Sequence, residues 1–321
     1  MPIERITILF NPSAGMGRAL VKKNEIEERL RGYGLAYDLA VTESEEQLRT
    51  LTREQARTGR ILVGAGGDST FHIMANEIMA ADAAVTLGMI PVGSSNDVAR
   101  EFGVSSLENA CRALRNQKTK GIDIGYISEG EKPVRYFLGQ ANIGLGVFVN
   151  RYVAELARRK PGLAGHQALA GVMGVLGAYR NQLIPVHLAV ESQAGRMEGE
   201  FTAAVISNVR YWATGKIINP NALPDDGRLD LCLIKKCSFL RLVRVSWLAG
   251  RGEPDRAKEV KILQSPSFRI SSETPFAIQT DGEILGSLEN PALFNRVALK
   301  IRPRALTIIY DEEPASSRID N

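Results

Sequence analysis

The sequence has few cysteines and no strong excess of charge of either sign. Its 321 residues include three cysteines, Cys111, Cys232 and Cys237, and none of them forms a CxxC pair. This pattern argues against a disulfide framework and favours reduced thiols in a cytoplasmic protein. The net charge is only +4, and the sequence has no zinc-finger spacing, no aromatic RNA-binding motif and no basic tail. We therefore expect no nucleic-acid partner.

Long apolar runs are absent as well. The longest, Ala168–Tyr179, is too short and too rich in glycine to span a bilayer. The N-terminal MPIERITILF carries charges inside its apolar run, unlike a signal peptide. Arg151–Arg159 and Arg158–Lys160 bring basic charge beside the apolar, glycine-rich stretch Gln167–Tyr179, and Phe239–Leu248 combines basic and apolar residues itself. Such stretches dock on anionic membrane surfaces or form core helices with solvated basic residues, and the sequence leaves both readings open.

The first hundred residues alternate between strand-like and helix-like patterns. This alternation predicts an α/β domain, a parallel sheet with helices on both faces, whose ligands bind beyond the carboxyl ends of the strands. The expected strands are Arg5–Phe10, Leu35–Val41, Ile61–Val63 and Ala84–Ile90, and the expected helices are Arg18–Arg31, Glu43–Thr58 and Thr70–Ala80.

From Ile122 onward short strand-like runs dominate, which predicts a mainly antiparallel second domain. We expect domain one over residues 1–121, domain two over 122–304, and a C-terminal strand and tail over 305–321 that packs back on either domain. The expected strands are Val134–Ala141, Pro185–Glu191, Gly199–Ser207, Leu229–Ile234, Ser267–Ile270, Phe276–Gln279 and Val297–Ile301, with helices at Val147–Arg159, Gln167–Arg180 and Ser238–Leu248 and a final strand at Ala305–Tyr310.

Three expected strands end in turns that combine glycine with Ser, Thr, Asn or Asp. The turns are NPSAGMG at 11–17, GGDST at 66–70 and PVGSSND at 91–97, and each opens a helix. Glycine lets the backbone approach a ligand closely, and free N–H groups at a helix start favour an anion. One such turn is equally well a capped helix. Three turns on one rim of a sheet predict a nucleotide-phosphate site.

Two common nucleotide-binding patterns fit poorly. The P-loop pattern GxxxxGK[ST] is absent. A dinucleotide-binding fingerprint starting at Gly15 and Gly17 would need a third glycine where Leu20 stands, and Asp38 lies inside a strand instead of at its end. We therefore disfavour both.

The ordered motifs resemble the diacylglycerol/sphingosine lipid kinase family, in particular its soluble bacterial members. NPSAGMG, GGDST and PVGSSNDVAR match that family's N-P-x-S-G-x-G, G-G-D-G-T and P-x-G-T-x-N-D-F-A-R. In the second half, LPDDGRLDL at 223–231 resembles its metal-loop segment and TDGE at 280–283 its late DGE motif. The resemblance implies a phosphofructokinase-like N-terminal nucleotide domain and a C-terminal β-sandwich.

The same resemblance implies an activity and a set of site residues. The activity is ATP- and Mg²⁺-dependent transfer of the γ-phosphate to a hydroxyl of a diacylglycerol-like lipid at the membrane surface. Glu283 would act as the base, with Asp281 and Asp68 as further catalytic acids. The ATP site would comprise Asn11, Thr42, Gly66, Gly67, Asp68, Ser69, Thr70 and Ser94, and a structural Mg²⁺ would be held by Leu223, Asp226 and Arg228.

Departures from the family pattern keep alternatives open. Ser69 stands where the family has glycine, and Ser69 fits only if that residue needs no positive φ. His72 and Ile73 replace Asn and Glu, and we expect His72 to be a helix-surface or packed histidine and not a catalytic one. A kinase acting on NAD and a non-catalytic nucleotide-binding regulatory module are the alternatives. Asp226-Gly227 and Asp281-Gly282 could also be plain hairpin turns. A homodimer is compatible with the sequence, which fixes no oligomeric state.

Overall fold

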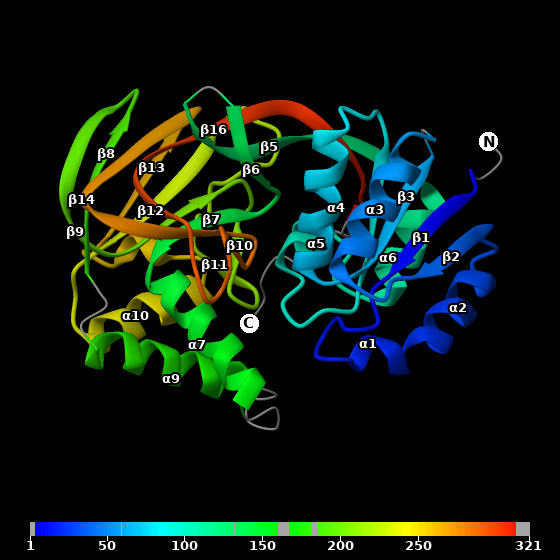
Figure 1. The fold of residues 1–321 in the computed structure, drawn as a ribbon, viewed down its shortest axis with the longest axis horizontal. Helices are drawn as coiled ribbons and strands as arrows, with labels where there is room; N and C mark the ends of the chain where they lie inside the picture. Colours follow the sequence, from blue (N-terminus) through cyan, green and yellow to red (C-terminus); the bar gives the residue numbers. More distant parts are fainter. Residues whose placement is uncertain (1–3, 59, 131, 160–166, 182–184, 313–321) are drawn as a thin grey trace. The chain divides into compact units, whose positions relative to one another are not determined.

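The computed structural model describes residues 4–58, 60–130, 132–159, 167–181 and 185–312. The chain forms two compact units (Figure 1). The first unit comprises Met1–Asp123, Ala213–Gly215 and Pro303–Asn321, and the second comprises Ile124–Trp212 and Lys216–Arg302. The C-terminal segment is therefore part of the first unit, and each unit is described below by itself.

The first unit contains a sheet of parallel strands. Strand β1 lies between β2 and β3, β4 pairs with β3, and the end of β16 pairs with β4 through Thr307 and Ile308. β1 and β3 are buried along their whole length, which explains why they consist of apolar residues and glycine apart from Thr7. The strands are β1 (Ile6–Phe10), β2 (Tyr37–Val41), β3 (Ile61–Gly66), β4 (Thr86–Pro91) and the last residues of β16 (Leu293–Ile309).

The helices of the first unit follow the strand ends. Ser44 and Ser106 cap the helices after them, accepting hydrogen bonds from the backbone N–H groups of Gln47 and Asn109, both at 3.1 Å. The expected helix over 18–31 is two helices, because the chain turns at Lys22. The helices are α1 (Arg18–Val21), α2 (Lys23–Gly32), α3 (Glu45–Ala56), α4 (Asp68–Ala80), α5 (Asp97–Glu101) and α6 (Leu107–Asn116).

The second unit is built on antiparallel strands. They pair in the order β13-β12-β9-β7-β14-β16, with β8 against β9 and β14. Phe137, Phe201 and Phe268 are central members of the core between them. The strands are β5 (Thr119–Glu129), β6 (Lys132–Phe137), β7 (Gln140–Gly144), β8 (Val186–Ser192), β9 (Gly195–Ser207), β10 (Tyr211–Trp212), β11 (Lys216–Ile217), β12 (Leu229–Lys235), β13 (Val260–Ser265), β14 (Ser267–Thr280) and β15 (Glu283–Ile284); β5 and β16 have residues in both units.

Several expected strands differ in extent. The run 134–141 is two strands, β6 and β7, separated by a turn at Leu138–Gly139. The runs 267–270 and 276–279 are one strand, β14, with a register shift between Ser271 and Phe276. The runs 297–301 and 305–310 likewise belong to the single strand β16. Polar residues inside β14 and β16 hide this continuity from a pattern of apolar runs.

Three long helices of the second unit lie on one face of its sheet (Figure 1). They are α7 (Leu145–Arg159), α9 (Gln167–Arg180) and α10 (Phe239–Gly250), and a short 3-10 helix, η1 (Pro254–Arg256), follows α10. Leu145, Ala178 and Val245 join these helices in a second core. Within the described ranges, no helix combines the length and the apolar character needed to cross a bilayer.

Candidate functional site

Three turns lie side by side at the carboxyl ends of β1, β3 and β4. The Asn11 side-chain amide donates to Thr70 Oγ1 at 3.0 Å, which joins the first turn to the start of α4. The backbone N–H groups of Val92 and Gly93 donate to the carbonyl of Gly66 at 2.8 and 3.0 Å, which joins the second turn to the third. The strand order β1-β3-β4 places these turns together.

The first turn also contacts the third. Gly15 and Met16 both have left-handed backbone, with φ of 61° and 62°. A Cβ on Gly15 would lie 2.9 Å from the carbonyl oxygen of Val92, so this approach needs glycine. Arg18 donates to the Gly15 carbonyl at 2.8 Å and to Ser94 Oγ at 3.3 Å. The three turns therefore form one continuous backbone surface.

The second and third turns meet at two glycines. A Cβ on Gly67 would lie 3.0 Å from the Cα of Gly93. Asn96, which has a left-handed φ of 53°, accepts from the Gly93 N–H at 3.1 Å and donates to the Gly93 carbonyl at 3.0 Å. Asn96 thus holds its own turn in shape, and Gly67 and Gly93 carry no side chain that would cover the backbone.

Asp68 connects the starts of two helices. It is the first residue of α4, and its carboxylate accepts the N–H groups of Asp97 and Val98 at 3.1 and 3.0 Å, in the first turn of α5. The carboxylate of Asp97 in turn accepts the N–H groups of Thr214 and Gly215 at 3.0 and 2.7 Å. Two acids thus fix three backbone segments of the first unit.

Sequence reasoning assigned no role to Asn96 or Asp97. Both lie in PVGSSNDVAR, so the motif contained the signal. What it did not show is that Asn96 shapes its own turn and that Asp97 binds residues more than a hundred positions away.

Thr42 lies at the end of β2. It is buried, and both its N–H and its hydroxyl donate to the carbonyl of Phe10 at 2.8 and 3.1 Å. This places Thr42 beside the end of β1, directly before the first glycine turn.

The departures from the family motif occupy ordinary positions in α4. Ser69 is exposed in the first turn, where the backbone is helical, so no positive φ is required. His72 is buried, and its carbonyl accepts from the side chain of Asn76 at 2.9 Å. Ile73 is buried as well. His72 and Ile73 therefore pack the helix, and Ser69 lies on its surface.

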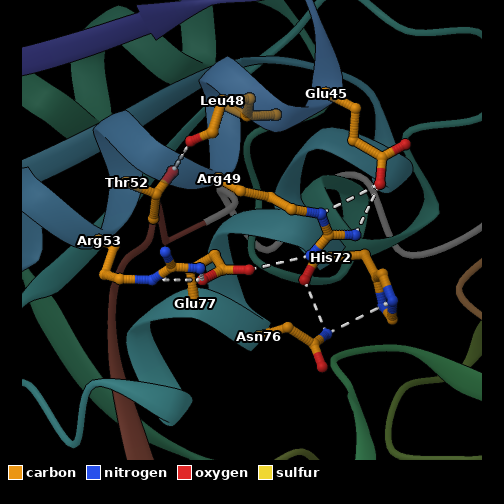
Figure 2. Close-up of polar contacts among 8 residues, drawn as sticks. All are labelled: Glu45, Leu48, Arg49, Thr52, Arg53, His72, Asn76 and Glu77. Atoms are coloured by element: carbon orange, nitrogen blue, oxygen red, sulfur yellow. Dashed lines mark hydrogen bonds and ion pairs between the residues drawn. The ribbon is translucent and has the colours of Figure 1, made fainter.

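Helix α4 is fixed to α3 by a group of ion pairs (Figure 2). Glu77, whose side chain is 9% exposed, accepts from Arg49 at 3.0 Å and from Arg53 at 2.6 Å. Arg49 also pairs with Glu45 at 2.6 Å. Because α4 begins at Asp68, these pairs help to fix the helix that carries the second turn.

Asp281 and Glu283 have different surroundings in the second unit. The buried Asp281 carboxylate accepts the N–H groups of Leu138, Gly139 and Gln140, each at 2.8 Å. This explains why the expected strand over 134–141 is interrupted there. The carboxylate of Glu283 is partly exposed and has no hydrogen bond or ion pair to the part of the chain that the structure describes. Asp281 therefore fixes the turn at Leu138–Gln140, and the Glu283 carboxylate is accessible to a ligand.

Helix α7 supports the turn at Asp281–Gly282, which precedes Glu283. Asn150 donates to the side-chain carbonyl of Gln279 at 2.7 Å and to the backbone carbonyl of Gly282. Asp281 and Gly282 both have left-handed backbone, with φ of 48° and 91°. The turn that presents Glu283 is consequently held from two sides.

The segment matched to the metal loop forms a turn closed by Asp226. Its carboxylate accepts the Arg228 N–H at 2.9 Å and the Gln264 side-chain amide at 3.0 Å. Burial raises the pKa of nearby Asp230 to about 6. Among the described residues, no cluster of three or more His, Cys, Asp or Glu could hold a metal. A cation here would depend on one exposed carboxylate and main-chain oxygens.

The expected site residues thus divide between the units. Those of the ATP set lie in the first unit and are Asn11, Thr42, Gly66, Gly67, Asp68, Ser69, Thr70 and Ser94; those in the second unit are Leu223, Asp226, Arg228, Asp281 and Glu283.

Comparison with known proteins identifies both units. The diacylglycerol kinase catalytic domain matches residues 5–127, and the YegS C-terminal NAD kinase beta sandwich-like domain matches residues 139–310, more than half of the chain. The chain belongs to the diacylglycerol kinase family. This confirms the resemblance seen in the motifs, and with it a two-domain fold whose C-terminal domain is β-rich.

Curated relatives span nearly the whole chain. A diacylglycerol kinase of Staphylococcus haemolyticus is 28% identical over 311 residues, covering 95% of this chain and 89% of the relative. A diacylglycerol kinase of Bacillus subtilis is 25% identical over 293 residues, covering 89% and 92%. Membership of the family, together with these relatives, supports a kinase.

Solved structures share the fold. A diacylglycerol kinase structure from Bacillus anthracis has a TM-score of 0.68 at 17% identity, covering 97% of this chain and 98% of that one. Another structure from the same organism reaches a TM-score of 0.74 at 19% identity, covering 97% and 96%. At these identities the likeness concerns the fold alone.

Proposed function

We propose that this diacylglycerol kinase family member transfers the γ-phosphate of ATP to the hydroxyl of a diacylglycerol-like lipid. The observation that carries the proposal is the contact of three glycine turns at the ends of β1, β3 and β4. Backbone N–H groups in such turns neutralise phosphate charge without a side chain in the way. Asn11 and Ser94 add side-chain polar groups to the same surface, and the buried Thr70 accepts the hydrogen bond that holds Asn11.

The acceptor hydroxyl needs a base. Glu283 suits this role because its carboxylate is partly exposed and makes no hydrogen bond or ion pair with the described residues, whereas the Asp281 carboxylate accepts three backbone N–H groups. As the acceptor oxygen bonds to the γ-phosphorus, Glu283 takes the hydroxyl proton, the bond to the bridging oxygen breaks, and ADP leaves. Asp281 is a positioning residue in this scheme, and so is Asp68, through the starts of α4 and α5.

Magnesium fits the donor chemistry of this chain. The Asp226 carboxylate with the main-chain oxygens of Leu223 and Arg228 offers hard oxygen ligands of the kind that Mg²⁺ prefers. The Asp226 carboxylate accepts from the Arg228 N–H and from the Gln264 side chain, and each carboxylate oxygen has two lone pairs. When bound, Mg²⁺ would neutralise negative charge. Asp226 and Arg228 would hold their turn in place through the hydrogen bond between them.

A transfer assay tests the proposal. Wild-type protein is incubated with γ-labelled ATP, Mg²⁺ and diacylglycerol in mixed micelles, and labelled phospholipid is counted. Glu283→Gln should lower kcat by about 10²–10⁴-fold. Glu273→Gln, an exposed carboxylate elsewhere in β14, should leave it unchanged. Equal labelling by wild type and Glu283→Gln would refute the role of Glu283, and no labelling by wild type would refute the lipid acceptor.

NAD is the second candidate acceptor, because the matched C-terminal domain is described as NAD kinase beta sandwich-like. The same assay with NAD in place of lipid decides between them. Labelled NADP without labelled lipid would replace the first proposal by the second. ATP binding without transfer to either acceptor would favour a nucleotide-binding regulatory module.

A further inference from the structure

Helix α10 has apolar residues on two opposite faces. One face is buried: Val245 and Ala249 pack in the core of the second unit. On the other, Leu240, Val243 and Trp247 are 79%, 49% and 60% exposed. Spacings of three and four residues put these three side chains in one row along the helix. We call Leu240, Val243 and Trp247 the docking stripe.

Positive charge flanks the docking stripe. Arg241, Arg244 and Arg251 are exposed, and α10 contains no acidic residue. The guanidinium of Arg251 lies 5.0 Å from the centre of the Trp247 ring, and its Nε lies 3.9 Å from the Glu253 carboxylate; Arg241 pairs with Glu259 at 3.5 Å. Arg244 has no ion pair within the described ranges of the chain. Part of this basic charge is therefore available to an anionic surface.

From this combination we propose that the docking stripe binds the surface of an anionic phospholipid bilayer. Apolar side chains of this size enter the boundary between headgroups and acyl chains, and tryptophan favours that boundary. The arginines then meet the phosphate layer, where each basic residue contributes about 1 kcal/mol, or roughly a fivefold gain in partitioning. This inference rests on the proposed function in one respect: a diacylglycerol-like acceptor lies in a bilayer, so the enzyme must reach a bilayer surface to phosphorylate it.

A second copy of the chain is a less suitable occupant. In a two-fold symmetric contact centred on the stripe, each residue near the axis faces its own counterpart. Arg244 would then approach Arg244 of the other copy, and like charges repel. A bilayer rich in phosphatidylglycerol offers the opposite charge along the whole stripe.

The test uses the fluorescence of Trp247. The chain has two tryptophans, Trp212 and Trp247, so Trp212→Phe leaves Trp247 as the only one. In this background, phosphatidylglycerol vesicles should shift Trp247 emission to the blue, and brominated acyl chains should quench it. Phosphatidylcholine vesicles should give a much smaller shift, and added salt should weaken binding.

Matched variants identify the surface. Val243 and Val134 are both 49% exposed, and Val134 lies on β6, outside the helix layer. Val243→Asp should weaken vesicle binding by about tenfold or more. Arg244→Gln should weaken it about fivefold, and Val134→Asp should leave it unchanged. Equal vesicle binding by the two valine variants would overturn the proposal. A blue shift that appears on raising the protein concentration without vesicles would also overturn it, because it would indicate self-association.

Membrane docking and catalysis fail separately in this design. Vesicle binding is measured without ATP, and lipid phosphorylation is measured in micelles of neutral detergent. Normal phosphorylation in micelles without binding to anionic vesicles would overturn the docking surface and leave the kinase proposal standing. Vesicle binding that depends on Val243, without phosphorylation of any lipid, would support the docking surface and overturn the kinase proposal.

Discussion

Gly93→Ala tests whether the phosphate-binding surface depends on close backbone contact. A Cβ at Gly93 would lie 2.8 Å from Asn96 Oδ1 and 3.1 Å from the backbone nitrogen of Gly67, with the Gly67 Cα nearer still. Comfortable contacts with carbon are about 3.5–4 Å, so the two turns must separate by about 1 Å. Neither backbone can rotate out of the way. Overpacking of this kind costs about 1–3 kcal/mol, which urea denaturation would measure.

The same displacement should weaken ATP binding. Gly66 accepts from the N–H of Gly93 at 3.0 Å, and separating the turns breaks the alignment of the backbone N–H groups that we propose bind phosphate. We expect ATP affinity to fall by at least about tenfold, or 1.4 kcal/mol, in calorimetry with a non-hydrolysable analogue.

Gly32→Ala is the matched control for Gly93→Ala. It lies in α2 of the same unit, where an added Cβ meets no heavy atom within 4 Å. Alanine should leave ATP affinity unchanged there and raise stability by up to about 1 kcal/mol. Wild-type stability and ATP affinity in Gly93→Ala would refute the assignment of this surface.

Further predictions concern the supports of the site. Replacing both Arg49 and Arg53 by alanine leaves Glu77 buried without its partners and should lower the free energy of unfolding by about 3 kcal/mol; a loss below 1 kcal/mol in urea denaturation would contradict a stabilising role. In Asp281→Asn an amide N–H₂ replaces a carboxylate oxygen that accepts backbone N–H groups. We expect the free energy of unfolding to fall by about 2 kcal/mol and kcat to fall as well. Glu283→Gln should stay within about 0.5 kcal/mol of wild type in the same measurement, and a larger loss would assign Glu283 a structural role.

Local sequence signals account well for the first unit. β1 and β3 are mainly apolar because they are buried along their length, and parallel neighbours end on the same rim. The contact between the turns follows from that topology. The break at Lys22 between α1 and α2 was not predicted, because Ala19, Ile26 and Leu30 keep the seven- and four-residue spacing of one helix face across it.

Contacts between distant residues account for what was missed. Asp281 lies 143 positions from Leu138, whose N–H it accepts. The sequence shows only an Asp-Gly pair at 281–282 and a strand-like run at 134–141. No local pattern tells that the carboxylate interrupts this run, so the sequence predicts one strand where the structure has β6 and β7.

The departures in α4 bear on the choice between a kinase and a non-catalytic module. That alternative was motivated by Ser69 in place of glycine and by Ile73 in place of a carboxylate. The backbone at Ser69 is helical and demands no glycine, so the first departure places no strain on the second turn. Ile73 is buried against the fold, while Glu77, one helical turn later, gives α4 a carboxylate that Arg49 and Arg53 bind. Because Ser69 requires no glycine, the motivation for a non-catalytic module weakens and the kinase remains the better-supported reading.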